Sequence, residues 1–290
     1  MSINNRINEI EKLLNKTIFD FKLLSDSFGI KCLKVRTSDN KNNIVKFYKN
    51  KNYTFNAIKA EAENLFFFNN LNINYFPKVI NNNDDYLVMS YIENDNLKPN
   101  ITKNDFLDAV TCLHSFSNKN YGFQFDTQIG GLKQKNKSTT NWVKFYRDER
   151  LNYIFELINS DEKMDKSINV KIEGLINNLE NYIPKNPKIS LLHGDLWEGN
   201  ILFSNLKFSG FIDPGSFFGH NELEVAYLRW FNPSFIDNNF LEKYNDVIAI
   251  DKNYLTYEPI YQLYYSLLNV YLWDRNYIDD VIKLLKKIKI

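Results

Sequence analysis

The stretch Leu191-Leu192-His193-Gly194-Asp195-Leu196-Trp197-Glu198-Gly199-Asn200 contains the features that decide the fold. Its apolar start is typical of a short buried strand, and that strand ends near the carboxylate of Asp195. Asn200 follows five residues later, and Asp213 comes directly after the next apolar run, residues 208–212. An ordered set of Asp, Asn and Asp at strand ends is what a phosphoryl-transfer centre requires.

These residue types suit the chemistry, because phosphoryl transfer needs alignment and charge neutralisation more than covalent catalysis. Asp195 is predicted to act as the catalytic base that positions an acceptor hydroxyl and takes its proton. Asn200 and Asp213 offer oxygen ligands of the kind that Mg²⁺ prefers, so they are predicted to hold Mg²⁺ against the phosphates of ATP. The Asp-to-Asn spacing equals that of the protein-kinase catalytic loop, and Asp213-Pro214-Gly215 takes the place of Asp-Phe-Gly.

A lysine for the ATP phosphates, held by a glutamate on a helix, completes such a centre. Lys46 lies in the strand-like run Ile44-Val45-Lys46-Phe47, which is the expected third strand. Glu61, on the helix that follows, is the predicted partner, and Glu63 on another face of that helix is the alternative. The chain has no G-x-x-x-x-G-K sequence, which excludes a P-loop NTPase.

The remaining nucleotide contacts are predicted in two short segments. A loop at residues 25–30 is expected to cover the phosphates, with Gly29 and the hydroxyl of Ser27 or Ser25 assisting its backbone amides. Residues 89–92, including Met89 and Tyr91, are expected to link two lobes and to bind adenine through their backbone.

Hydrophobic periodicity predicts an α+β protein with a bilobal, protein-kinase-like fold. Residues 1–92 form the small N-terminal nucleotide-binding lobe, with an antiparallel sheet and a helix at 54–71. Residues 93–290 form the larger, mainly helical lobe for catalysis and substrate binding. The other predicted helices span residues 3–16, 104–116, 141–159, 166–182, 221–231, 237–248 and 256–273, and the other strands span residues 32–35, 86–92, 189–192 and 208–212.

Bulk properties exclude several classes of protein. The 290 residues carry 36 basic and 35 acidic side chains, so no strong field steers the chain onto nucleic acid or an anionic membrane. The longest apolar runs are too short to span a bilayer, and the polar N-terminus is unlike a signal peptide. The two cysteines, Cys32 and Cys112, form no CxxC pair, which favours reduced thiols in a cytoplasmic protein.

Several stretches resemble the fructosamine kinase (ketosamine-3-kinase) family. Residues 192–200, LHGDLWEGN, resemble its LHGDLWxGN signature, and residues 211–224 resemble its DPAsfyGhrExdl block, with Gly215 where the family usually has alanine. Residues 142–151 resemble its W..ff...RL helix. His114, Tyr121-Gly122-Phe123 and Tyr261-Gln262-Leu263 also follow in family order, so the resemblance covers essentially the whole chain.

The resemblance implies an aminoglycoside-phosphotransferase-like kinase fold. It implies transfer of the γ-phosphate of ATP to the 3-hydroxyl of a ketosamine, a sugar adduct of an amine of the fructosamine or ribulosamine type, and a role in deglycation. Carried onto this chain, it makes Asp195 the base, Asn200 and Asp213 the metal ligands, and Lys46 with Glu61 the phosphate clamp.

Further residues around the quoted stretch have predicted roles. Trp197 is expected to stack on a sugar-like acceptor. His193 is expected to order the loop of residues 193–200, here called the catalytic loop. His220, with Glu222 and Glu224, is expected to order the segment after Asp213 and to cap the helix that follows.

Two other interpretations stay open. A kinase of the same fold could act on an aminoglycoside, choline or another small alcohol, although Trp197 and the block from Asp213 to Glu224 argue against it. A catalytically inactive nucleotide-binding regulator is the second, although the complete set of Lys46, Asp195, Asn200 and Asp213 argues against it. The expected partner is a small-molecule or protein-bound ketosamine substrate.

Overall fold

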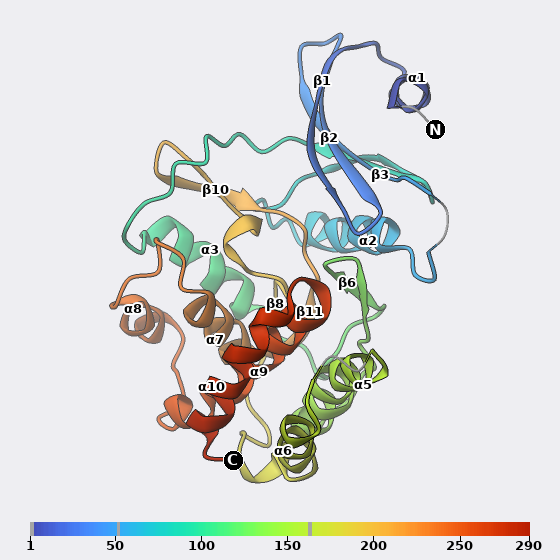
Figure 1. Cartoon of the computed structure of the whole chain (residues 1–290). Helices are drawn as coiled ribbons and strands as arrows, with labels where there is room; N and C mark the ends of the chain where they lie inside the picture. The colour runs from blue at the N-terminus through green and yellow to red at the C-terminus, as the bar shows by residue number, and fades with distance from the viewer. Residues whose placement is uncertain (1–2, 51–52, 162–163) are drawn as a thin grey trace. The chain divides into compact units, whose positions relative to one another are not determined.

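The structure, a computed structural model, describes residues 3–50, 53–161 and 164–290 (Figure 1). The chain divides into two compact units. The first comprises residues 1–97, 127–133 and 201–215, and the second comprises residues 98–126, 134–200 and 216–290. The sequence predicts contiguous lobes with a boundary after residue 92, and that boundary stays a prediction. The two units are not contiguous in sequence, because segments 127–133 and 201–215 pack with the N-terminal residues.

The first unit is built on an antiparallel sheet. In the described residues its strand order is β1-β2-β3-β5-β4. The bounds are α1 Ile3–Leu14, β1 Ile18–Ser27, β2 Ile30–Thr37, β3 Asn42–Tyr48, α2 Ala57–Asn70, β4 Val79–Asn82 and β5 Tyr86–Ser90. The predicted antiparallel sheet, with a helix after its third strand, is confirmed.

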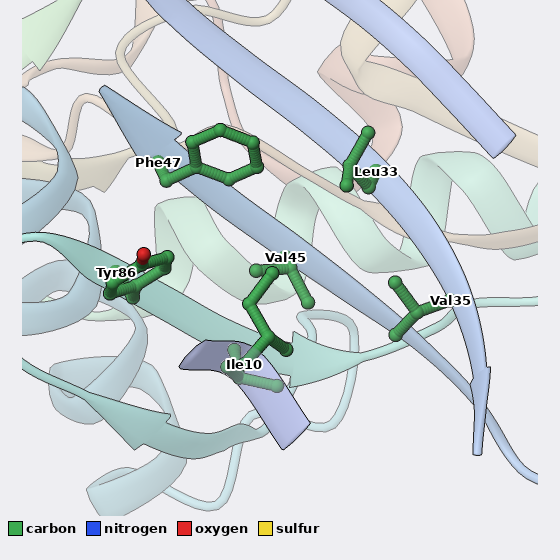
Figure 2. Packing of buried hydrophobic residues seen from close by; sticks show 7 residues of the cluster. Ile10, Leu33, Val35, Val45, Phe47 and Tyr86 are labelled. Atoms are coloured by element: carbon green, nitrogen blue, oxygen red, sulfur yellow. The ribbon is translucent and has the colours of Figure 1, made fainter. Parts of the chain in front are cut away.

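One face of this sheet forms a hydrophobic core (Figure 2). Successive side chains of a strand point to opposite faces, so every second residue enters the same layer. The residues of this layer are Leu33 and Val35 on β2, Val45 and Phe47 on β3, and Tyr86 and Val88 on β5. Ile10 of α1 covers them and is fully buried. Lys46, between two core residues, must therefore point to the opposite face.

The loop predicted at residues 25–30 is mostly strand. Ser25, Asp26 and Ser27 pair with residues 30–32 of β2, which leaves only Phe28 and Gly29 as the turn. Their φ angles are +51° and +76°. Positive φ at both central residues is typical of a type I′ turn, whose twist matches that of the flanking strands. Pairing along β2 therefore outweighs the loop preference of these small polar residues.

The segments 127–133 and 201–215 also belong to the first unit. They include β6 (Thr127–Ile129), which contacts α2, and the hairpin of β9 (Ile201–Ser204) and β10 (Lys207–Phe211). The backbone N–H of Phe211 donates to the carbonyl oxygen of Tyr75 at 2.7 Å. This bond fixes the end of β10, just before Asp213.

The second unit is mainly helical, as predicted. Its helices are α3 Asn104–Ser115, α4 Trp142–Tyr146, α5 Asn152–Ser160, α6 Lys166–Asn177, α7 Asn221–Phe231, α8 Phe240–Val247, α9 Tyr254–Leu272 and α10 Ile278–Ile288. β8 (Ile189–Leu192) pairs antiparallel with β11 (Phe217–His220). α7 packs against α9 (Figure 1). In the described part of the chain, no helix is long and apolar enough to cross a membrane.

The helix predicted over residues 141–159 is interrupted by a π-helical turn, Arg147–Leu151. Arg150 in this turn is fully buried. Its guanidinium lies 4.0 Å from the ring centroid of Phe217 and donates to the backbone oxygen of Lys135 and to Oδ1 of Asn136. The wider π-helical turn places the buried guanidinium of Arg150 against these partners. The partners lie outside residues 141–159, so the hydrophobic periodicity of that stretch does not predict the turn.

Candidate active site

Three charged side chains meet in the first unit. The Nζ atom of Lys46, on β3, lies 2.8 Å from each carboxylate oxygen of Glu61, on α2. The same Nζ lies 2.5 Å from Oδ1 of Asp213, which follows β10. Lys46 and Glu61 are buried, whereas the side chain of Asp213 is 35% exposed. The predicted ion pair of Lys46 with Glu61 is therefore present, and Glu63 is not the partner of Lys46.

The backbone around Asp213 is unusual. Its φ angle is +55°, in a region that few residues other than glycine adopt. Such conformations cluster at active sites and ligand clamps, where surrounding contacts hold them in place. The pairing of Asp213 with Lys46 is one such contact. The sequence had assigned Asp213 to a metal ion alone.

The charge of Lys46 is secured by its partners. Burial alone would lower the pKa of Lys46, but Asp213 and Glu61 together raise it above its ordinary value. Burial raises the pKa of the Glu61 carboxyl, and Lys46 opposes that shift. Burial also raises the pKa of the Cys32 thiol, opposite Lys46 on β2, to about 12. Lys46 is therefore expected to be positively charged and the Cys32 thiol to be neutral. A buried cation of this kind is suited to bind phosphate.

A second cluster lies in the second unit. The Nδ2 atom of Asn200 donates to the backbone oxygen of Asp195 at 2.8 Å and to its Oδ2 at 3.1 Å. Both residues are buried. A 3₁₀ turn, Glu198–Asn200, folds the loop back and brings together two residues that are five apart in the sequence. The predicted base and the predicted amide ligand are therefore in direct contact.

Asn200 and Asp213 each carry an oxygen atom of the kind that binds Mg²⁺. Because Asp195 engages the nitrogen of Asn200, the amide oxygen is the atom left for a metal ion. Among the described residues, no three His, Cys, Asp or Glu side chains form a ready-made metal site. Mg²⁺ is usually held by one or two carboxylates, with waters and phosphate oxygens completing its octahedron. The amide of Asn200, in the second unit, and the carboxylate of Asp213, in the first, each offer an oxygen ligand of this type.

The backbone of the catalytic loop is held by Glu224. This carboxylate, in the first turn of α7, is completely buried. Its Oε2 accepts from the N–H of His193 at 3.0 Å, and its Oε1 accepts from the N–H of Gly194 at 2.7 Å. His193 in turn accepts the N–H of Asp195 at Nδ1, at 3.2 Å. Glu224 and His193 therefore fix the backbone on the N-terminal side of Asp195.

A buried histidine completes the surroundings of Glu224. Nε2 of His114 lies 3.0 Å from Oε2 of Glu224, and Nδ1 of His114 lies 2.6 Å from the hydroxyl of Tyr244. Burial would raise the pKa of Glu224, but hydrogen bonding to His114 and to the loop N–H groups lowers it below its ordinary value. Glu224 is therefore an ionised carboxylate inside the protein, with partners on both oxygens.

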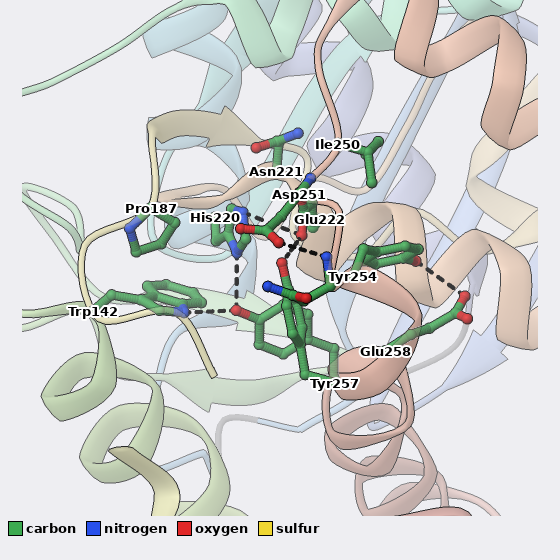
Figure 3. Close-up of polar contacts among 12 residues, drawn as sticks. Trp142, Pro187, His220, Asn221, Glu222, Ile250, Asp251, Tyr254, Tyr257 and Glu258 are labelled. Atoms are coloured by element: carbon green, nitrogen blue, oxygen red, sulfur yellow. Dashed lines mark hydrogen bonds and ion pairs between the residues drawn. The ribbon is translucent and has the colours of Figure 1, made fainter. Parts of the chain in front are cut away.

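His220 belongs to a separate network (Figure 3). Its Nδ1 lies 2.9 Å from the hydroxyl of Tyr261, which accepts the indole N–H of Trp142 at 2.8 Å. Its Nε2 lies 3.5 Å from Glu222, which also accepts the hydroxyl of Tyr257. The network connects β11 with α4, α7 and α9, and so orders the segment after Asp213 on its C-terminal side.

The predicted capping of α7 is wrong. His220 is the N-cap residue, but its side chain makes no capping hydrogen bond. The carboxylates of Glu222 and Glu224 also bond to other segments rather than to the helix end. Burial explains the difference, since both carboxylates lie inside the unit, where backbone N–H groups of other loops need acceptors.

Trp197 is half-buried beside Asp195. Its ring packs edge-on against Phe231 of α7, with a centroid distance of 5.7 Å. A Cβ atom at Gly199 would overlap the ring, so glycine at that position lets the indole lie over the loop. Glu198, between them, accepts Lys98 at 2.8 Å, a pair that the sequence did not predict.

The other predicted nucleotide residues lie in the first unit. Ser27 is the last residue of β1 and Gly29 lies in the turn. Met89 is a buried residue of β5, and the strand predicted to reach residue 92 ends at Ser90, so Tyr91 follows it. The Nζ of Lys34 lies 3.7 Å from the ring centroid of Tyr91. No contact of these residues decides whether they bind nucleotide, so their roles stay predictions.

Comparisons with known proteins settle the family. The fructosamine kinase family model matches residues 30–290. The chain belongs to the fructosamine kinase family. A probable ketoamine kinase of Enterococcus faecium is 30% identical over 206 residues, 69% of this chain and 71% of that protein. A chloroplastic protein-ribulosamine 3-kinase of Arabidopsis thaliana is 29% identical over 212 residues, 69% of this chain and 63% of that protein.

Solved structures agree with the kinase-like fold. A protein of Thermobifida fusca assigned as a fructosamine-3-kinase has a TM-score of 0.83 at 20% identity, over 99% of both chains. The aminoglycoside phosphotransferase APH(2″)-Ib, solved with ADP, has a TM-score of 0.64 at 19% identity, over 97% of this chain and 96% of that one. The predicted fold class is thus confirmed. Because the chain belongs to the fructosamine kinase family, it is a phosphotransferase with an alcohol group as acceptor.

Proposed function

We propose that this member of the fructosamine kinase family uses Mg²⁺ and ATP to phosphorylate the 3-hydroxyl of a ketosamine, of the fructosamine or ribulosamine type, in deglycation. The observation that carries the proposal is the contact of Asp195 with Asn200 on a loop fixed by buried Glu224. A carboxylate held in this way is suited to accept a proton from a hydroxyl placed beside it.

Each cluster has a proposed task. Asp195 orients the acceptor hydroxyl and takes its proton as the base. Lys46, held by Glu61, binds the ATP phosphates. Asn200 and Asp213 would hold Mg²⁺, which when bound neutralises phosphate charge and fixes the phosphate geometry. Asp213 would exchange part of its contact with Lys46 for that role.

The remaining proposals concern recognition. The backbone at Met89 and Tyr91 is proposed to bind adenine, and the turn with Ser27 and Gly29 to cover the phosphates. Trp197 supplies a half-buried aromatic face beside Asp195, which suits stacking on a sugar-like acceptor. We also infer a cytoplasmic location and no nucleic-acid partner. The net charge of +1 supports the absence of a nucleic-acid partner, and the free thiols of Cys32 and Cys112 support the location.

The decisive experiment is a product assay with ATP, Mg²⁺ and a panel of fructosamines and ribulosamines, in which phosphorus NMR locates the new phosphate. A phosphate on the 3-hydroxyl is the expected result. Turnover with an aminoglycoside or choline, and none with any ketosamine, would replace the proposed substrate class. Nucleotide binding with no phosphorylated product would instead favour a regulator.

Asp213→Asn should mainly weaken binding of Mg²⁺-loaded nucleotide. The substitution keeps the shape of the side chain but removes the charge that attracts the metal ion. Loss of a residue that only supports a metal ligand costs about 10–100-fold in affinity, so loss of the ligand should cost more. Calorimetry with ATP should show this loss of affinity with Mg²⁺ and a smaller loss with EDTA.

Asp84→Asn, at a side chain that is 79% exposed, is the control. Equal Mg·ATP affinity in the wild type and Asp213→Asn would remove Asp213 from the metal site.

Glu61→Gln should impair use of ATP, because it takes a charged partner from buried Lys46. A hydrogen bond between charged groups contributes about 1.5–3 kcal/mol. That range corresponds to roughly 10–100-fold in kcat/KM for ATP. Glu63→Gln, two residues along the same helix, should stay near wild type. Similar losses of kcat/KM for ATP in the two variants would mean that Glu61 is not the specific partner of Lys46 in ATP use.

A further inference from the structure

The catalytic loop has separate anchors on the two sides of Asp195. On the N-terminal side, Glu224 and His193 hold its backbone. On the C-terminal side, the loop closes with a single 3₁₀ turn at residues 198–200. Turns of this kind have poorer hydrogen-bond geometry than α-helices, so this side of the loop gains from an anchor outside the turn.

That outside anchor is Lys98, which binds one residue of the turn twice. Its Nζ donates to Oε1 of Glu198 at 2.8 Å and to the backbone oxygen of the same residue at 3.2 Å. The two side chains are only 24% and 34% exposed, so water screens the pair incompletely. Because the ammonium bridges the carboxylate and the carbonyl, it fixes the side chain and the backbone of Glu198 together. An ion pair to the carboxylate alone would leave the backbone free.

Fixing the backbone at Glu198 also fixes Asn200, two residues later in the same turn. Gly199 lies between them and has no Cβ atom to restrict its backbone, so the bond from Lys98 matters more for the path of the turn. Nδ2 of Asn200 donates to Oδ2 of Asp195 at 3.1 Å, which leaves the amide oxygen for another partner. The direction of that oxygen depends on the backbone that Lys98 holds.

We propose that Lys98 is a positioning residue, which holds the 3₁₀ turn so that Asn200 directs its amide oxygen at Mg²⁺. This inference rests on the proposed function, in which Asn200 is a metal ligand. It goes beyond that function because Lys98 touches neither nucleotide nor acceptor in this role and acts only through Glu198. Loss of a residue that supports a metal ligand costs about 10–100-fold in metal affinity. Since Lys98 acts through an intervening residue, the lower end of that range is expected.

Lys98→Met tests the inference, because it removes the ammonium and keeps most of the side chain. Calorimetry with ATP should show about 10-fold weaker binding with Mg²⁺ and wild-type binding with EDTA. Tm should stay within about 4 °C of wild type. In the metal-free protein, the N–H of Asn200, which donates to the backbone oxygen of Trp197 at 3.0 Å, should exchange with solvent faster than in the wild type.

Three further variants separate positioning from a general loss of charge. Lys98→Arg should restore Mg·ATP affinity and slow exchange, because a guanidinium can donate to both oxygens of Glu198. Glu198→Gln keeps both acceptors and should lose less affinity than Lys98→Met. Lys119→Met, at an exposed lysine of the same unit, should leave both quantities unchanged.

A double substitution makes the test specific. In an Asn200→Ala background, Lys98→Met should cause no further loss of Mg·ATP affinity, because the group that it positions is gone. A multiplicative loss in the double variant would overturn the inference. So would wild-type Mg·ATP affinity in Lys98→Met, or a loss equally large with EDTA. If the wild type phosphorylates no ketosamine, the proposed substrate fails, but calorimetry and exchange still decide the inference because neither needs an acceptor.

Discussion

Asp195→Asn is expected to lower turnover of a ketosamine by roughly 10²–10⁴-fold, the range typical of losing a general base. The amide has the same size as the carboxylate and can still accept the hydrogen bond from Asn200 through its oxygen. It cannot take the proton of the acceptor hydroxyl. Because the backbone contacts of the loop are retained, Tm and the affinity for ATP should stay close to wild type. Single-turnover kinetics with calorimetry separates these quantities.

Asp246→Asn is the matched control, because Asp246 is an exposed residue of α8. It should leave turnover unchanged. Wild-type turnover in Asp195→Asn would remove Asp195 from the role of base. A loss of ATP affinity as large as the loss of turnover would assign the residue to nucleotide binding instead.

The sequence predicts those parts of the site that depend on short spacing. Asn200 lies five positions after Asp195, and one 3₁₀ turn suffices to join them. Lys46 and Glu61 are 15 residues apart, on a strand and the helix that follows it, so alternation and helical periodicity already place them on facing surfaces. Successive strands of a small antiparallel sheet usually pair, and this holds for β1-β2-β3 and for β4-β5. The pairing of β3 with β5 does not follow from this rule.

Contacts over long separations could not be predicted in this way. Asp213 is 167 residues from Lys46, and its ion pair depends on a hairpin that packs with the first unit. Glu224 appears in the sequence as a helix-start acid, for which capping is the usual role. Its actual partners, the N–H groups of His193 and Gly194, lie 31 and 30 residues away and become visible only in the fold. The sequence contains each of these residues but not the packing that selects their partners.

Glu224→Gln is expected to destabilise the second unit and to impair catalysis together. Glu224 is completely buried, with both oxygens bound to donors of the catalytic loop and Nε2 of His114 close to one oxygen. A glutamine keeps one acceptor oxygen but turns an N–H₂ group towards a donor that needs an acceptor. Breaking a buried charged network by changing one partner costs about 3–5 kcal/mol. Urea unfolding followed by fluorescence and circular dichroism measures this loss, and kcat should fall because the loop before Asp195 loses its anchor.

Acid sensitivity gives the same variant a second readout. Burial opposes ionisation of Glu224, but His114 and the loop N–H groups lower its pKa in the folded protein. The stabilising contribution is therefore complete above the ordinary pKa of glutamate and declines as the pH falls towards the lowered value. Glu224→Gln should lack this decline, whereas Glu242→Gln, at an exposed position of α8, should keep it and change stability by less than about 0.5 kcal/mol. Wild-type stability and turnover in Glu224→Gln would show that the catalytic loop holds its conformation without this carboxylate.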